Sequence, residues 1–160
     1  MRAHLKTIAS YTKKRLAQDL RSEEERRQKR LFETIESMEL GSSRISTWSL
    51  SIIGGSMIVF MNEEYIQPDI HNFKYTYFLF LIGWVLLGLS IYYSKRITGR
   101  KMAATSKINN TGALKTIFLK VNAYLSNQFV YFNWALVIFA LWLGLYFVCR
   151  IFSQELKCLL

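Results

Sequence analysis

Histidine and cysteine, the side chains that most often carry chemistry, are few and scattered in this sequence. His4 and His71 lie far apart, and neither has a partner at the spacing of a metal-ligand pair. Asp69 with His71 could form a weak two-ligand metal site, although a solvated loop is the simpler explanation. Cys149 and Cys158 are too few to define a disulfide framework. We therefore expect no metal centre and no disulfide scaffold.

Motifs for nucleotide binding and for nucleophilic catalysis are missing as well. The stretch "TGRK" (Thr98–Lys101) lacks the glycine spacing of a phosphate-binding loop, and no serine stands in a G-x-S-x-G pattern. The apolar parts of the chain also lack the titratable residues that an enzyme inside a membrane needs. The sequence thus predicts neither an enzyme nor a bound cofactor.

The charges of this 160-residue chain, whose formal net charge is +10, are strongly segregated. Residues 1–44 hold 11 Lys/Arg and 7 Asp/Glu, whereas three later runs hold almost no charge. These runs are residues 45–62, 75–93 and 129–150, and the last ends at Arg150. A spanning helix needs roughly 20 apolar residues, and a soluble domain would interleave its charges. The fold class we expect is an all-α integral membrane protein with about three transmembrane helices, although a buried core helix is the alternative for each run.

The distribution of basic residues predicts the orientation. Residues 1–44 and 94–128 carry most of the Lys/Arg, whereas residues 63–74 carry one lysine and three acids: Glu63, Glu64 and Asp69. Basic flanks stay on the cytoplasmic side. We therefore expect a multi-pass protein of the inner (plasma) membrane with a cytoplasmic N-terminus and an acidic external hairpin. The short tail, residues 151–160, lies outside if the third run crosses fully, and otherwise inside.

The acidic hairpin and the basic segment are the two charged candidate sites. Glu63 and Glu64 could attract ions at the mouth of an oligomer. On the inner side, a set of basic residues is expected at the membrane surface, where anionic lipid attracts cations: Lys95, Arg96, Arg100, Lys101, Lys115 and Lys120.

The N-terminal segment, residues 10–40, contains no glycine or proline and predicts a long charged helix that ends near Gly41. It could pack on its own chain, associate with a second copy, or dock a cytoplasmic protein partner. Membrane-surface contact is a weaker alternative. No nucleic-acid partner is expected, because its acids interrupt the basic face that such binding favours.

The segment 94–128 predicts two different parts. The first, "KRITGRKMAATSKINNTG", is basic and rich in small residues, which suggests a mobile loop. The second, residues 113–128, has Leu114, Ile117, Phe118, Val121 and Leu125 on one helical face. It predicts an amphipathic helix that either lies in the inner membrane interface or packs as an ordinary helix.

Small and polar residues inside the apolar runs mark candidate contacts between helices. Ser51 and Gly55 form a small-xxx-small pair beside Gly54 and Ser56, which lets helices approach closely in lipid. These four residues either pack against other helices or line a wet path. Asn133 in the third run is a candidate for an interhelical hydrogen bond.

The order of a charged helix, "STWSLSIIGGSMIVF", a short turn and "YFLFLIGWVLLGLSIYYSKR" resembles the layout of SLATT proteins, small bacterial membrane effectors. The resemblance covers about residues 10–128 and rests on this layout rather than on a diagnostic motif. It implies membrane disruption or conductance in antiviral (anti-phage) defence. The third apolar run departs from the two-helix pattern of that family.

Two functions follow from these features. The first is a small oligomeric membrane effector that forms a pore or depolarises the membrane, because three helices are few for a transporter and no internal repeat is visible. The second is a non-conducting scaffold or accessory subunit, which anchors a soluble partner through residues 10–40.

Overall fold

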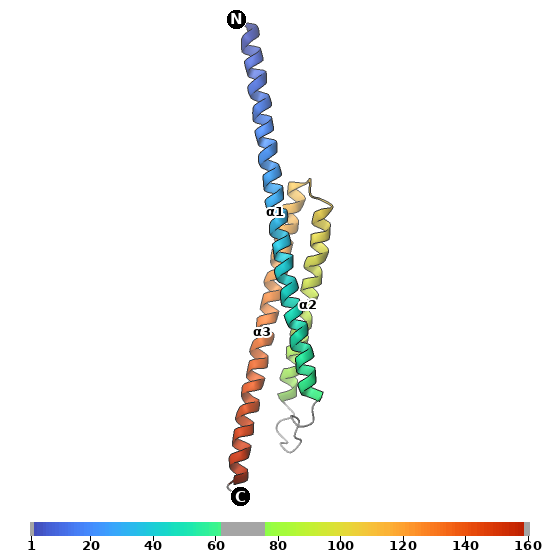
Figure 1. Ribbon diagram of the computed structural model, residues 1–160, viewed down its shortest axis with the longest axis vertical. Helices are drawn as coiled ribbons and strands as arrows, with labels where there is room; N and C mark the ends of the chain where they lie inside the picture. The colour runs from blue at the N-terminus through green and yellow to red at the C-terminus, as the bar shows by residue number, and fades with distance from the viewer. Residues whose placement is uncertain (1, 62–75, 159–160) are drawn as a thin grey trace.

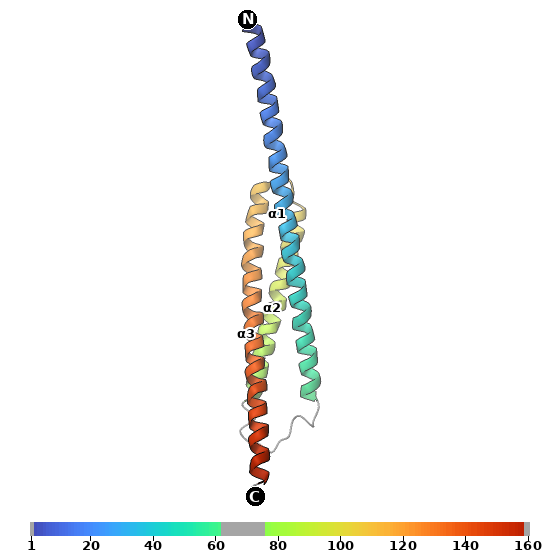
Figure 2. The same ribbon diagram turned by 60° about the vertical axis from the view of Figure 1, so that its left-hand side comes forward.

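The computed structural model consists of three long helices side by side (Figure 1). They are α1 (Arg2–Met61), α2 (Thr76–Thr105) and α3 (Thr111–Cys158). The structure describes the backbone of residues 2–61 and 76–158, and the side chains of residues 13, 15–59, 61 and 78–148. Within this part all regular secondary structure is helical and only residues 106–110 form a turn, which confirms the expected all-α fold. α1 and α3 run in opposite directions to α2 and enclose a common core (Figure 2).

Inward-facing residues recur at alternating steps of three and four, the heptad pattern that lets helices pack around one another. In α1 the series is Leu31, Ile35, Met38, Ser42, Ile45, Ser49, Ile52 and Ser56, all buried or half-buried. α2 continues the pattern with Phe80, Gly83, Leu87, Ser90, Ser94, Ile97, Lys101 and Ala104. Side chains of α1 therefore face α2 and α3 over more than three heptads.

The apolar core falls into two clusters along the bundle. The cluster nearer the α2–α3 turn contains Ile35, Ile97, Leu114, Ile117 and Val121. The other cluster contains Ile45, Leu87, Phe132 and Ala135, with Phe139 packed against it. Both clusters draw on all three helices, so the bundle is held together by burial at both levels.

α1 is longer than the sequence predicts. Its 60 residues continue through Gly41, which was expected to end the charged helix. Gly41 lacks a positive φ, and neighbouring Ser42 and Ile45 are buried, so packing on α2 and α3 keeps the helix unbroken there. A helix of this length spans about 90 Å. Its first third extends beyond the α2–α3 turn (Figures 1 and 2), and we call residues 2–23 the N-terminal arm.

The segment 94–128 also differs from expectation. The stretch expected to be a mobile loop is helical as far as Thr105, because Ile97 and Ala104 are fully buried. The turn to α3 takes only residues 106–110. Leu114, Ile117 and Val121 are covered by α1 and α2, so this segment is a packed part of α3 and no separate interfacial helix.

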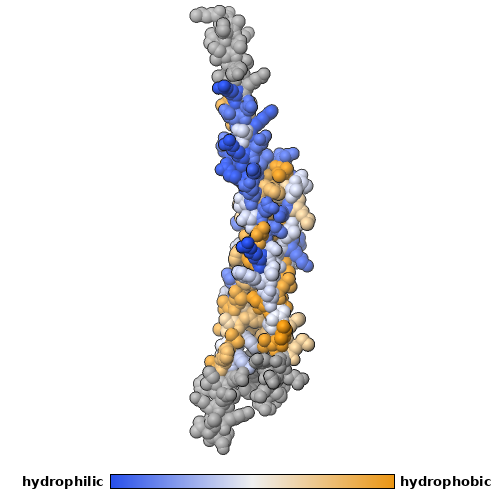
Figure 3. Space-filling model, viewed as in Figure 1, coloured by the Kyte–Doolittle hydropathy of each residue, from blue (hydrophilic) through white to orange (hydrophobic). Residues whose placement is uncertain are grey.

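Two helices are long and apolar enough to cross a membrane. The candidate spans within the described residues are Phe78–Thr105 in α2 and Thr111–Val148 in α3, while the apolar end of α1 is not among them. Their outward side chains include Phe78, Val85, Trp134, Leu141 and Phe147, each more than half exposed. In Figure 3 the hydrophobic surface gathers in the half of the bundle away from the arm. Exposed apolar surface of this extent marks a membrane or a partner interface.

Gly83 of α2 lies against the side chain of Phe139 on α3. A Cβ atom at this position would lie 2.8 Å from Cζ of Phe139, so only a glycine admits the ring. Phe139 also packs edge-on against Phe80, with ring centroids 5.1 Å apart, and Phe80 contacts Trp142 at 4.7 Å. The core at this level is therefore a dry aromatic cluster.

Gly83→Ala is expected to destabilise the bundle, because overpacking costs about 1–3 kcal/mol while the gain in helix propensity is about 1 kcal/mol. Gly88→Ala is the matched control, since a Cβ there meets nothing within 4 Å. Thermal unfolding in mild detergent, followed by circular dichroism, should show a lower midpoint for Gly83→Ala and an unchanged or higher one for Gly88→Ala. Equal midpoints would show that Phe139 does not depend on this close approach.

Candidate functional site

A layer of buried polar side chains joins the three helices between the two apolar clusters. Ser42 of α1 donates its hydroxyl proton to Oε1 of Gln128 on α3 at 2.6 Å. Nε2 of Gln128 donates in return to the carbonyl oxygen of Ser42 at 3.0 Å. The hydroxyl of Ser94 on α2 lies 3.0 Å from that of Ser42. We call Ser42, Ser94 and Gln128 the polar layer.

The geometry assigns a role to each proton of the polar layer. Because Ser42 gives its single hydroxyl proton to Gln128, Ser94 donates its own proton to Ser42, either to the hydroxyl at 3.0 Å or to the carbonyl oxygen at 3.4 Å. Ser42 and Gln128 are at most 1% exposed, and Ser94 is 7% exposed, so water cannot replace these bonds. An amide left unpaired in such surroundings costs about 1–3 kcal/mol. Any register shift of one helix is therefore penalised, as with a buried polar residue in a coiled coil.

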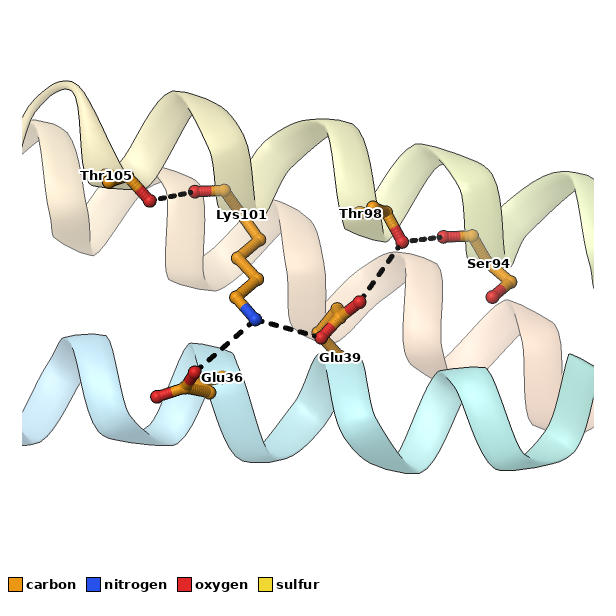
Figure 4. Close-up of polar contacts among 6 residues, drawn as sticks. All are labelled: Glu36, Glu39, Ser94, Thr98, Lys101 and Thr105. Atoms are coloured by element: carbon orange, nitrogen blue, oxygen red, sulfur yellow. Dashed lines mark hydrogen bonds and ion pairs between the residues drawn. The ribbon is translucent and has the colours of Figure 1, made fainter.

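An ion-pair cluster lies one to two turns from the polar layer, toward the arm. Lys101 Nζ is 3.1 Å from Glu39 and 3.5 Å from Glu36, and Thr98 donates to Glu39 at 3.5 Å (Figure 4). The hydrogen bond to Glu39 raises the pKa of Lys101 above its ordinary value of 10.5, and Glu36 adds to this effect. The lysine side chain is 28% exposed, so water screens part of the attraction.

A second polar contact fixes α1 at the tip of the bundle. Nε2 of Gln28 donates to the Thr111 hydroxyl, which donates to Glu24, both at 2.9 Å. Oδ1 of Asn110 accepts from the backbone N–H of Ala113 at 3.0 Å and caps α3. Thr111, the first residue of α3, therefore also holds α1 in place. The N-terminal arm extends from this contact.

The structure separates the four small residues expected to pack helices together. Ser56 does bridge helices: it accepts a hydrogen bond from Nε1 of Trp84 at 2.8 Å. Ser51, Gly54 and Gly55 face outward, and a Cβ at either glycine would meet nothing within 4 Å. Among the described residues, the hydroxyl of Ser51 bonds within its own helix, to the Thr47 carbonyl at 3.0 Å.

Asn133 is exposed on α3 and makes no hydrogen bond with the described part of the chain. The interhelical bond expected for it is thus absent among the described residues. Gln128, five residues earlier, makes that kind of bond instead.

The basic residues expected at a membrane surface follow two patterns. Lys95, Arg96, Lys115 and Lys120 are exposed, and Arg100 is half-buried. Arg96 donates to the hydroxyl of Tyr92, with contacts of 2.6 and 2.9 Å. Lys101 instead turns inward to the carboxylates of α1.

The acidic hairpin residues Glu63, Glu64 and Asp69, together with His71, lie outside the described residues. The side chains of Cys149 and Cys158 do so too. Among the residues that are described, no group of three or more His, Cys, Asp or Glu could hold a metal ion.

Sequence reasoning missed the polar layer, although a signal was present. Ser42 lies seven residues after Ile35, Ser94 three before Ile97, and Gln128 seven after Val121. A polar residue that continues an apolar heptad series is expected to face the core.

Comparisons with known proteins add nothing to this assignment: no family, curated protein or solved structure matches this chain.

Ser42→Ala is expected to destabilise the protein by about 1–3 kcal/mol, because it leaves the amide of Gln128 without its donor. Ser43→Ala is the control, since Ser43 is exposed and such changes stay within about 0.5 kcal/mol. The measurement is the thermal midpoint in detergent. Equal unfolding temperatures of the two variants would contradict the structural role of the polar layer.

Lys101 should stabilise the bundle in a pH-dependent way. Its folded pKa is raised, so its contribution is complete at neutral pH and is lost as pH rises through that folded pKa. Between about pH 9 and about pH 11.5 the unfolding midpoint of the wild type should fall more than that of Lys101→Met. Lys115→Met, at an exposed position, should follow the wild type. Parallel curves for the wild type and Lys101→Met would contradict the assignment.

Proposed function

We propose that this chain is a multi-pass protein of the plasma membrane, with its arm in the cytoplasm. Support comes from the outward apolar side chains of α2 and α3, which gather in the half of the bundle away from the arm. Burying such side chains in hydrocarbon is favourable by about 25 cal/mol per Å². The apolar end of α1, residues 45–61, runs along the same half and is the third span.

The cytoplasmic orientation of the arm follows from charge. Arg44, Lys95 and Arg96 are exposed where the apolar parts of α1 and α2 begin or end. Cations at this level favour the inner leaflet. Tyr92 and Tyr93 lie beside them, as expected for aromatic rings at a membrane interface. The N-terminal arm continues from this basic level away from the membrane.

Within that membrane, the protein acts as a small oligomeric effector that converts an event at the arm into a change in the bilayer. One observation carries this proposal: α1 is one unbroken helix from the arm into the third span. A force on the arm therefore reaches residues 45–61 without a hinge. The polar layer and Lys101 couple the same helix to α2 and α3.

Any conducting path requires more than one copy. The described interior at membrane level is filled by Phe80, Leu87, Phe132 and Phe139, all buried or half-buried. Such a core leaves no room for water or ions. The resemblance to SLATT effectors supports membrane disruption in bacterial antiviral defence as the outcome.

A second function, a non-conducting scaffold, is favoured by the surface of the arm. Leu16 and Leu20 are 63% and 60% exposed and lie one helical turn apart. Such a pair on an isolated charged helix suits docking of a soluble helical partner. The scaffold would hold that partner at the membrane without changing permeability.

Tightly controlled expression in bacteria distinguishes the two functions, once alkaline carbonate washing has shown that the chain stays in the membrane. For an effector, induction lowers the membrane potential, recorded with a voltage-sensitive dye. Ser22→Pro should preserve the potential, because proline breaks a helix at a cost of about 3 kcal/mol and uncouples the arm. Ser22→Ala should depolarise like the wild type.

An intact potential at high expression, with a soluble protein co-purifying through Leu16 and Leu20, would contradict the effector and support the scaffold. Depolarisation by Ser22→Pro at the wild-type level would show that the arm does not drive the change. Extraction of the chain by carbonate would contradict the membrane assignment itself.

A further inference from the structure

The unpaired amide of Asn133 lies on a face of α3 that points away from α1 and α2. We propose that this face binds the same face of a second copy of the chain, with Asn133 pairing across the interface. The inference rests on the proposed membrane location, and it names the partner and the contact that assemble the protein.

The face is a continuous series that the chain itself leaves uncovered. Its members follow alternating steps of three and four residues, and all are exposed: Ser126, Phe129, Asn133, Leu136, Ala140 and Leu143. The inward series of α3, from Leu114 to Ala135, belongs to the core and shares none of these residues. α3 thus carries a second heptad series, the pattern of helices that pack side by side.

Asn133 differs from the exposed hydroxyl groups of α1 at this depth. The outward hydroxyls of α1 are already paired within their own helix: Thr47 donates to the Ser43 carbonyl at 3.1 Å, and Ser51 to the Thr47 carbonyl at 3.0 Å. They can face lipid without loss. The amide of Asn133 makes no such bond, so in hydrocarbon it needs an external partner.

A second copy supplies that partner by symmetry. All copies enter the membrane with the same orientation, so a residue on this face meets itself at the same depth. A carboxamide both donates and accepts, which makes Asn133 complementary to Asn133 of another copy. Ala140, seven residues further along, is small enough to let two α3 helices approach. Asn133 lies four residues, about 6 Å, beyond Phe129, where the third apolar run begins.

Disulfide crosslinking in native membranes tests the geometry. In a full-length background with Cys149→Ser and Cys158→Ser, Ser126→Cys and Ala140→Cys should each give crosslinked dimers on mild oxidation. Leu141→Cys is the control, because Leu141 is 57% exposed but lies off the series. Crosslinking of Leu141→Cys as efficient as that of Ala140→Cys would overturn the proposed face.

Energy transfer between labelled copies in lipid vesicles tests the role of the amide. Asn133→Leu should weaken association by about 3- to 30-fold, the range of an interhelical hydrogen bond in lipid. Asn133→Gln, which keeps a donor and an acceptor, should retain most of the affinity. Unchanged association of Asn133→Leu would overturn the pairing.

Failure of this inference is separable from failure of the membrane assignment. A chain that resists carbonate extraction yet gives no crosslink and no energy transfer is a membrane monomer, which overturns the interface alone. A chain that carbonate releases overturns the membrane assignment and the inference together.

Discussion

The bundle depends on one group of paired polar side chains in its interior, the polar layer, whereas Ser90 Oγ and Trp142 Nε1 are buried without a partner among the described residues. Gln128 bonds to both the hydroxyl and the carbonyl of Ser42, and Ser94 completes the group from α2. In the apolar layers above and below, sliding of one helix by a turn would still place apolar side chains against apolar side chains. The polar layer does not tolerate it, since each displaced partner is left buried and unbonded. It therefore fixes which residues of each helix face outward.

The broad outline of the fold was predictable because it depends on burial and charge over long windows. The helical state of the described parts of all three apolar runs follows from their length and lack of proline. The structure differs where local propensity opposes packing. Gly41 and the residues around Thr98 favour termination or a loop, yet buried Ile45, Ile97 and Ala104 on either side hold those segments helical. A single sequence does not reveal such long-range contacts.

The candidate site was predictable by residue type more than by position. Asn133 and the small residues around Gly55 were expected to mediate contacts between helices, but in one chain that role belongs to Gln128, Ser42 and Gly83. The reason is the direction in which each side chain points from its helix. A helix has inward and outward faces, and the residue types alone do not say which face packs against which neighbouring helix. The heptad series that runs from Ile35 through Ser42 places Ser56 on the inside, whereas Ser51 lies off this series and faces outward.

The register of the three helices also determines how the proposed contact between copies relates to the coupling of α1 with α2 and α3. An interface on the outer face of α3 is formed without α1, so the arm of each copy stays accessible beyond the bundle tip (Figure 1). The outward side of α1, with Ser51, Gly54 and Gly55, is then free for a contact of a different kind. Because the polar layer ties α1 to Gln128, rotation of α1 about its axis would strain the helix that carries Asn133. One physical linkage would therefore connect the arm, the apolar half of α1 and the proposed contact between copies.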